Sequence, residues 1–465
     1  MVFSSTTDLP YDPEKFVNRA EELKIVRERV LACQRNEVVD QSLISFWGVA
    51  DIGKSWLLKH IEHLYAYKEP ERDSLRKPTL PLYHEFREEE QSLTAVSQSL
   101  VHYLAAHLPA NLSQPEAAPP PTFAGDPTEA LVAYLKRLAE RVVILLLFDT
   151  TEYVDDTLWD TMETSLLEPL LKSDKVLVIV TGRNRAPRWK RVEVRRRAMP
   201  TEKSEVRPFT TEATQEQLQR LGLPQAAKQA NLLMQDSLGT PGLSARLGRS
   251  WQQLSEEQYK QERIETWKQY IDDIFGHLSP TWQQMIEAVV PLRYYRTQAL
   301  RLMLTQSAYE VEDDSDVFLL RVLRKLDKQT HLVWWDNSQN AYVTAVVARW
   351  ILNRQLQVCQ PTKFIDQHTL ALNMYKNWAQ EFPNSLPAYI PELLFHESTL
   401  ARAQEQNPDE TIDQTAFEKM ISQLSIDNQD ILQRRLENDT ELKALMPTLF
   451  KNLLDFIDSS VNQNQ

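Results

Sequence analysis

The sequence predicts an α/β domain with a parallel sheet covered by helices, followed by smaller and mainly helical regions. Two observations carry this prediction. Short, continuously apolar runs alternate with helical patterns between residues 41 and 205, which is typical of parallel strands buried on both faces. Beyond residue 206 such runs stop, and apolar residues recur at helical spacing instead.

The apolar runs place four strands in the α/β domain. The carboxyl ends of parallel strands lie at one edge of the sheet, and ligands of such folds bind at that edge. We therefore expect Gly48, Asp149 and Thr181, which end three of the strands, to lie near one another. The predicted strands are LISFW (43–47), TLPLYHEF (79–86), VVILLLF (142–148) and KVLVIV (175–180).

The rest of the chain divides by its pattern of elements. Helices at 281–290, 297–304 and 315–328, followed by a hairpin formed by LVWW and AYVT, give the element order of a winged helix. The predicted regions are an N-terminal segment (1–40), the α/β domain (41–205), a region of short helices (206–265), the winged helix (266–357) and a C-terminal all-α region (358–465).

Composition excludes several classes of protein. The net charge of -13 argues against a protein that coats nucleic acid over its whole surface. Cys33 and Cys359 are the only cysteines, which excludes a disulfide framework or a cysteine-based zinc site. The N-terminus lacks the pattern of a signal peptide, and the longest apolar run is too short to span a bilayer. We expect a soluble cytoplasmic protein with no membrane partner.

Residues 48–56, GVADIGKSW, carry the spacing of a phosphate-binding P-loop between a strand and a helix. The N–H groups of such a loop and of the following helix bind phosphate, Lys54 reaches the β and γ phosphates, and Ser55 ligates magnesium. We therefore predict a site for ATP or ADP with Mg²⁺. The loop residues expected to contact the nucleotide are Gly48, Asp51, Ile52, Gly53, Lys54, Ser55 and Trp56.

Three further residues are candidates for catalysis beside Lys54. Asp149 ends a buried strand, from which a carboxylate can hold Mg²⁺ directly or through water, so Asp149 and Ser55 are the candidate metal ligands. Glu152 can orient the attacking water, or it can cap the next helix, whose first turn favours negative charge. Arg183, after the fourth strand, can sense the γ-phosphate or remain a solvated arginine.

Asp51 is an unusual residue for a phosphate loop because it places an acid in front of the anion. Two unit charges about 5 Å apart at an effective dielectric of about 20 interact by roughly 3 kcal/mol. Repulsion of this size would weaken phosphate binding on the order of a hundredfold. An acid that points away from the phosphates costs far less. Asp also tolerates the left-handed backbone better than most residues, so it can replace a glycine there.

The ordered motifs resemble the STAND class of signal-transducing P-loop ATPases, relatives of AAA+ proteins with an NB-ARC/NACHT-like core. The resemblance covers about residues 14 to 357. It rests on the P-loop, the winged-helix-like segment, and the motifs FVNRAEEL (16–23), LLLFDTTE (145–152), IVTGRNR (179–185) and LGTPGL (238–243).

This resemblance implies an ASCE-type sheet, a helical lid over 206–265 with a Gly-x-Pro motif, and a winged helix that closes over the nucleotide. Arg19 would belong to the segment that flanks the base, and Pro241 would pack near adenine or simply break a helix. Asp149 and Glu152 match Walker B, and Arg183 the first sensor.

The sequence departs from the family pattern at three positions. Asn18 stands where a glycine usually precedes the arginine, and Asp51 replaces a usual loop glycine. Many members offer a winged-helix histidine to the bound diphosphate, whereas the nearest alignment here gives Ala345. These departures weaken the expectation of a tightly locked ADP state.

The resemblance implies a regulatory switch that hydrolyses ATP slowly with Mg²⁺. The switch would act through a protein partner that supplies signal input or effector output. A nucleotide-dependent homo-oligomer is a further option. Two alternatives stay open. The departures fit an inert scaffold. A DNA-binding ATPase would use the basic run 183–197 and one face of the helix over 315–328, which carries Arg321, Arg324, Lys325 and Lys328.

Overall fold

The computed structural model divides into two compact units, residues 1–266 and 267–465. No helix in the described part of the chain is long and apolar enough to cross a membrane. The structure describes residues 10–68, 77–89, 92–109, 112, 126–183, 187–200, 204–275, 279–306, 315–330, 333–336 and 339–463.

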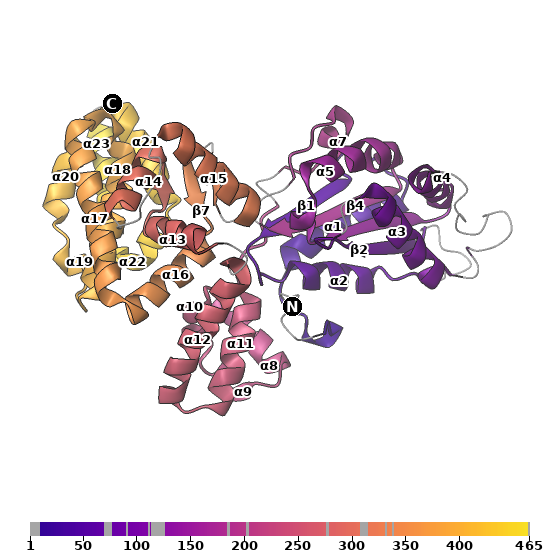
Figure 1. Ribbon diagram of the computed structural model, residues 1–465, viewed down its shortest axis with the longest axis horizontal. Coiled ribbons are helices and arrows are strands. Elements are labelled where there is room, and N and C mark those ends of the chain that lie inside the picture. Colours follow the sequence, from indigo (N-terminus) through magenta and orange to yellow (C-terminus); the bar gives the residue numbers. More distant parts are fainter. Residues whose placement is uncertain are drawn as a thin grey trace. The chain divides into compact units, whose positions relative to one another are not determined.

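A four-stranded parallel sheet forms the centre of the first unit (Figure 1). Its strand order is β1-β4-β3-β2, so the loop after β1 lies beside the end of β4. The four strands predicted from the apolar runs are all present, and the predicted α/β fold with its parallel sheet is confirmed. The strands are β1 (Leu43–Gly48), β2 (Thr79–Glu85), β3 (Val143–Asp149) and β4 (Val176–Arg183).

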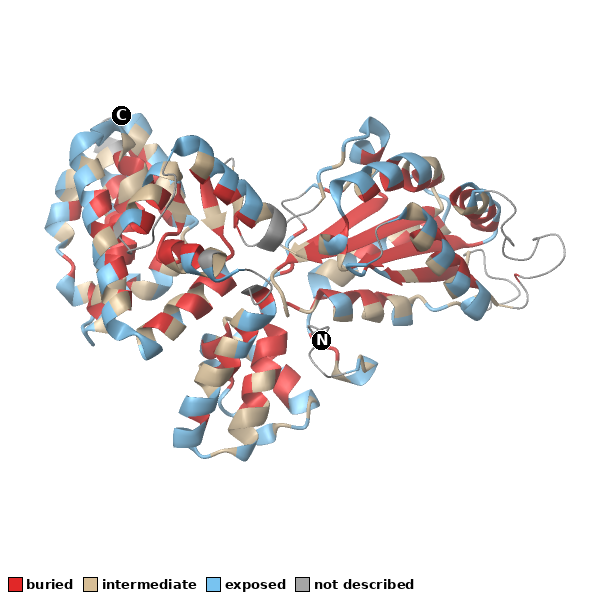
Figure 2. Ribbon diagram, viewed as in Figure 1, coloured by how far each residue is buried: buried red, intermediate tan, exposed pale blue. Residues whose placement is uncertain are grey.

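Helices cover both faces of this sheet, and the strands are buried almost throughout (Figure 2). Alternate residues of a strand face opposite sides, so Val143 and Leu145 pack with one helical layer while Ile144 and Leu146 pack with the other. The first layer is α1 (Ala20–Gln34) and α2 (Lys54–Leu64); the second is α3 (Leu93–His107), α4 (Pro127–Ala139), α5 (Asp156–Met162), the π-helix η3 (Glu163–Leu167) and α6 (Glu168–Leu171).

The segment after β4 protects the open edge of β1. Following α7 (Val192–Arg197), this segment forms isolated bridges from Ala198 to Leu43 and from Glu205 to Trp47. The N–H of Trp47 donates to Ser204 at 3.0 Å, and the N–H of Val206 donates back to Trp47 at 2.8 Å. The edge strand that carries the phosphate loop is therefore paired on both sides.

The predicted lid consists of helices that complete the first unit. Residues 238–240 separate α10 from α11, and Pro241 occupies the first helical position of α11, which proline's fixed φ suits. Helix α12 continues through the boundary expected at 265/266, and the division of the units falls within it. The lid helices are α8 (Thr211–Arg220), α9 (Pro224–Ala227), α10 (Ala230–Ser237), α11 (Pro241–Gln253) and α12 (Glu256–Phe275).

The second unit begins with the helices and hairpin expected from the sequence, joined by a two-residue strand into a sheet of order β5-β7-β6. The winged-helix name for this arrangement stays an interpretation. The elements are α13 (Pro280–Val289), β5 (Tyr294–Tyr295), α14 (Thr297–Gln306), α15 (Asp316–Thr330), β6 (Val333–Asp336) and β7 (Ala341–Thr344).

The C-terminal helices belong to the same compact unit. They confirm the predicted C-terminal helical region. They are α16 (Val346–Cys359), α17 (Pro361–Glu381), α18 (Leu386–Ala403), α19 (Pro408–Thr411), α20 (Gln414–Ser422), α21 (Ile426–Glu437), α22 (Thr440–Leu445) and α23 (Pro447–Gln463).

A buried arginine joins the two halves of this unit. Arg293, just before β5, forms ion pairs with Glu392 of α18 at 2.8 Å and with Asp439 at the start of α22 at 2.6 Å. Arg293 and Glu392 are each 3% exposed. Burial alone would lower the pKa of Arg293, but the carboxylates of Glu392, Asp439 and Glu441 outweigh that effect and raise it. The guanidinium stays charged and holds the helices together.

We expect Arg293→Ala to destabilise the second unit by about 3–5 kcal/mol, because it leaves the buried Glu392 carboxylate without its partner. Chemical denaturation of the full chain, followed by tryptophan fluorescence, measures the loss. Arg301→Ala removes a solvent-exposed pair with Asp316 and should cost under about 1 kcal/mol. Equal, small losses in both variants would contradict the assigned role of Arg293.

Candidate functional site

The phosphate loop leaves β1 at Gly48 and enters α2 at Lys54. Gly53 precedes the helix with φ of 93°, a left-handed conformation that glycine adopts without strain. The side chain of Lys54 folds back along the loop, and its Nζ donates to the carbonyls of Gly48 at 2.9 Å and Val49 at 2.8 Å. The loop therefore lies between a strand and a helix, as predicted, while the reach of Lys54 to phosphates stays a prediction.

Burial gives the side chain of Lys54 a pKa that is unusually low for a lysine. Its side chain is 9% exposed, and burial lowers its pKa to about 8, although Glu152, Asp149 and Asp51 act in the opposite direction. A phosphate that replaced the loop carbonyls would stabilise the ammonium form. Binding of an anion and protonation of Lys54 are thus coupled.

Asp149 lies at the end of β3 within a network of donors. Its Oδ2 accepts a hydrogen bond from the hydroxyl of Tyr83 on β2 at 2.9 Å, and its Oδ1 accepts from the N–H of Thr150 at 2.8 Å and from the hydroxyl of Thr181 on β4. The carboxylate is 1% exposed. Three neighbouring donors fix its orientation, which suits a carboxylate that holds a metal through water.

Glu152 and Arg183 form an ion pair at the same edge of the sheet. The Nε of Arg183 lies 2.9 Å from Oε1 of Glu152. The other oxygen of Glu152 is buried and accepts no hydrogen bond within the described part of the chain. Glu152 lies in the first turn of the short 3-10 helix η2 (Thr151–Tyr153), a position that favours negative charge, although it forms no capping hydrogen bond there. The next longer helix, α5, is capped by the side chain of Asp155.

The acid of the loop points at the lid. Asp51 adopts φ of 60°, so it takes the left-handed position that glycine usually fills. Its carboxylate forms an ion pair with Arg246 of α11, and its carbonyl accepts a hydrogen bond from the N–H of Gly242 at 3.0 Å. The side chain that was expected to weaken phosphate binding is therefore paired with a cation.

Arg19 reaches the loop from the N-terminal segment. Its guanidinium donates to the carbonyls of Ile52 and Arg207 and lies 4.7 Å from the centre of the Phe209 ring. Burial lowers the pKa of Arg19 to about 10. Both Arg19 and Pro241 lie close to Gly53, within 4.0 Å of where a Cβ atom would be. The N-terminal segment, the loop and the lid thus meet at one point.

The remaining loop residues differ in exposure. Ser55 is exposed at the start of α2, as a residue that ligates a metal beside a nucleotide must be, while Ile52 is buried in the core. The ring of Trp56 packs edge-on against the ring of Tyr11, with 5.6 Å between their centres. Among the described residues no group of three or more His, Cys, Asp or Glu side chains could hold a metal ion.

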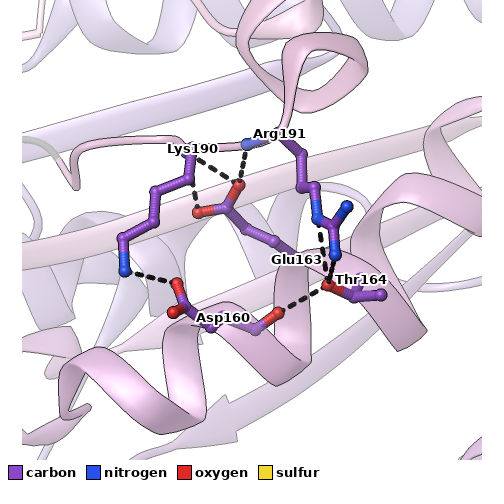
Figure 3. A pocket seen from close by; sticks show the side chains of 5 residues that line it. All are labelled: Asp160, Glu163, Thr164, Lys190 and Arg191. Atoms are coloured by element: carbon purple, nitrogen blue, oxygen red, sulfur yellow. Dashed lines mark hydrogen bonds and ion pairs between the residues drawn. The ribbon is translucent and has the colours of Figure 1, made fainter.

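Much of the basic run 183–197 is occupied within its own domain. In the hollow beside η3, Lys190 pairs with Asp160 at 2.6 Å, and the Arg191 guanidinium donates to the hydroxyl of Thr164 (Figure 3). The buried carboxylate of Glu163 accepts the N–H groups of both basic residues. Residues 184–186 lie outside the described part of the chain.

The basic face expected on the third winged-unit helix is present on α15 for three of its four residues. Arg321, Arg324 and Lys325 are exposed, and Nζ of Lys325 lies 4.8 Å from the centre of the Trp282 ring. The side chain of Lys328 lies outside the described part. This face is shared with exposed apolar residues, since Val317 and Leu320 are 62% and 38% exposed.

Sequence reasoning missed Tyr83, Arg246 and Phe209. Tyr83 could have been found, because it lies near the carboxyl end of β2, at the edge of the sheet where ligands bind. Arg246 follows the Gly-x-Pro motif by about one helical turn, but its partner Asp51 lies far away in sequence. No local pattern indicates that pair.

The loop, its buried lysine and the Asp149 network define a P-loop NTPase domain. Residues 42–222 match the NACHT domain family, and the resemblance to STAND-class P-loop NTPases is confirmed. The comparison with curated proteins gave no match.

Several solved structures match the chain at low sequence identity. The chain is similar to the Walker-type ATPase PABY2304 of Pyrococcus abyssi, with 16% identity, a TM-score of 0.51, and coverage of 74% of this chain and 99% of that one. It is also similar to a STAND protein with a tetratricopeptide repeat sensor, PH0952 from Pyrococcus horikoshii, with 12% identity, a TM-score of 0.33, and coverage of 98% and 67%. The ORC1 protein of Aeropyrum pernix, solved in complex with DNA, matches with 16% identity, a TM-score of 0.36, and coverage of 74% and 93%.

We expect Tyr83→Phe to destabilise the first unit by about 1–3 kcal/mol, because a buried oxygen of Asp149 loses its donor. Phenylalanine keeps the ring beneath Nζ of Lys59, which lies 3.2 Å from its centre. Denaturation of the full chain gives the loss, and the same change in an Asp149→Asn background is the control. An equal loss in both backgrounds would show that the hydroxyl acts elsewhere.

Nucleotide affinity should fall as the pH rises above about 8, because phosphates need the ammonium form of Lys54 and the free lysine has a pKa of about 8. Below that pH the lysine is already charged and affinity is full. Between pH 7 and pH 9 we expect a loss of about tenfold, the change in the protonated fraction. Calorimetric titration with ADP and Mg²⁺ measures it. Lys54→Arg should give a flat profile; a flat profile in the unaltered protein would contradict the coupling.

Proposed function

We propose that this chain is an ATP-binding regulatory switch that couples the ATP or ADP state to an open or closed domain arrangement and to a protein partner. The observation that carries the proposal is the meeting of three segments at the phosphate loop. Arg19 bonds Ile52, and Gly242 of the lid bonds Asp51. A ligand that moves the loop would therefore act directly on the lid. A switch needs such a contact, because a ligand can shift a conformational equilibrium only if it interacts differently with the two states.

The residues present fit a magnesium ion with the nucleotide. Ser55 offers an exposed hydroxyl, and Asp149 is oriented by three donors so that it can hold the ion through water. Bound Mg²⁺ would neutralise charge on the phosphates. The free oxygen of Glu152 would accept the proton of an attacking water while Arg183 fixes the carboxylate.

Slow hydrolysis suits a regulatory switch. Hydrolysis would serve only to reset the switch, so rapid turnover is not needed. The partner would provide signal input or effector output, and a nucleotide-dependent homo-oligomer is consistent with the same proposal. The DNA-binding alternative is supported less well. Lys190, Arg191, Arg196 and Arg197 of the basic run make contacts within the domain, so the alternative depends mainly on α15.

The first test is the nucleotide content of the freshly purified protein, released by denaturation and separated by chromatography. We expect ADP or ATP at about one per chain, and its loss in Lys54→Ala, because the loop lysine supplies the charge that phosphates require. Lys24→Ala, an exposed lysine of α1, is the matched control and should keep the nucleotide.

An empty site would be tested further with millimolar ATP and Mg²⁺ in a thermal denaturation experiment. At a hundred times its Kd a ligand stabilises the folded state by about 2.7 kcal/mol, which is readily measured. No nucleotide and no thermal shift would contradict the proposal and favour an inert scaffold.

A further inference from the structure

The acid of the phosphate loop contacts the lid at two points of one helix. The carbonyl of Asp51 accepts from the N–H of Gly242, and its carboxylate pairs with Arg246. Gly242 and Arg246 are four residues apart, so they lie on the same face of α11, one turn from each other. The first turns of the lid helix therefore rest on the middle of the loop through backbone and side chain together.

Helix α11 lies so close to the loop at Gly242 that residue 242 has no room for a side chain. A Cβ atom at Gly242 would lie 2.7 Å from both Cβ and Cγ of Asp51, a distance that atoms of this kind do not adopt. The two charged side chains are partly shielded from water, with 15% of Asp51 and 23% of Arg246 exposed. An ion pair in such a setting is stronger than one on an open surface.

The pairing changes what the acid does to a bound anion. The charge of Asp51 acts on Lys54, where it partly opposes the lowering of the pKa by burial, so a phosphate held by that lysine would be repelled by the same charge. An unpaired Asp51 would repel the phosphate. With Arg246 beside it, the local charge is close to zero and most of the repulsion is cancelled.

We propose that Asp51 and Arg246 form a latch that holds helix α11 of the lid on the phosphate loop and sets nucleotide affinity by neutralising the acid. Its effect on affinity rests on the proposed function; its effect on the lid does not. Both residues are positioning residues, and each has a different consequence when its charge is removed.

The affinity test uses the opposite signs of the two single changes. Asp51→Asn removes the repulsive charge and leaves Arg246 to attract phosphate, so ADP should bind about tenfold more tightly to the full chain stripped of nucleotide. Arg246→Gln uncovers the acid, so ADP should bind about tenfold more weakly. The double variant should lie near the unaltered protein. A pair that only supported the fold would weaken binding in both single variants, and that result would overturn the proposal.

The lid test needs no nucleotide. In hydrogen exchange of the nucleotide-free full chain, the amides of Gly242 and the following turn should exchange faster in either single variant, and no faster still in the double variant. Arg249→Gln makes the same change of charge on α11, where the structure describes no contact with the loop, and should leave this exchange unaltered. Unchanged exchange in Asp51→Asn and Arg246→Gln would overturn the latch.

The two readouts separate the latch from the function it serves. If the unaltered protein binds no ADP, the proposed switch fails, and exchange in the lid alone decides whether the latch exists. If ADP binds and is lost in Lys54→Ala while both single variants leave affinity and exchange unchanged, the switch stands and the latch fails.

Discussion

The constraint on which the site depends is the convergence of strand ends at one edge of a parallel sheet. Gly48 on β1 pairs in register with Arg183 on β4, and Glu85 on β2 with Asp149 on β3. Backbone hydrogen bonds between the strands thus fix the positions of the loop, Asp149 and Arg183, independently of any side-chain contact. The close packing of both buried faces of the sheet holds this edge in place. The polar side chains at the edge therefore need only short-range contacts to be oriented.

Sequence reasoning performs well where the information is local. Seven apolar residues before Asp149 indicate a buried strand, and the spacing from Gly48 to Ser55 indicates a loop between a strand and a helix, because periodicity and glycine placement act over a few residues. These signals were enough to predict the four strands and the loop between β1 and α2. They also gave the helices and hairpin of the second unit to within a few residues.

The pairing of distant side chains could not be predicted in this way. In the sequence Asp51 looks unfavourable for phosphate binding, because its partner Arg246 lies 195 residues away and is brought to it only by the folding of the lid. Arg293 is similar, because its partners Glu392 and Asp439 lie 99 and 146 residues further along the chain. A single sequence carries no local pattern for contacts of this kind.

The structure also bears on whether the departures from the family pattern are signs of decay. Asn18 and Asp51 both take left-handed backbone positions where a glycine is usual, and each side chain makes a specific bond: Oδ1 of Asn18 accepts from the N–H of Arg19 at 2.8 Å, and Asp51 pairs with Arg246. A site that had merely lost its function would accept residues there without such compensation. The bond of Asn18 stays within the N-terminal segment, whereas the pair of Asp51 with Arg246 connects the phosphate loop to helix α11, a segment that the proposed switch would have to move.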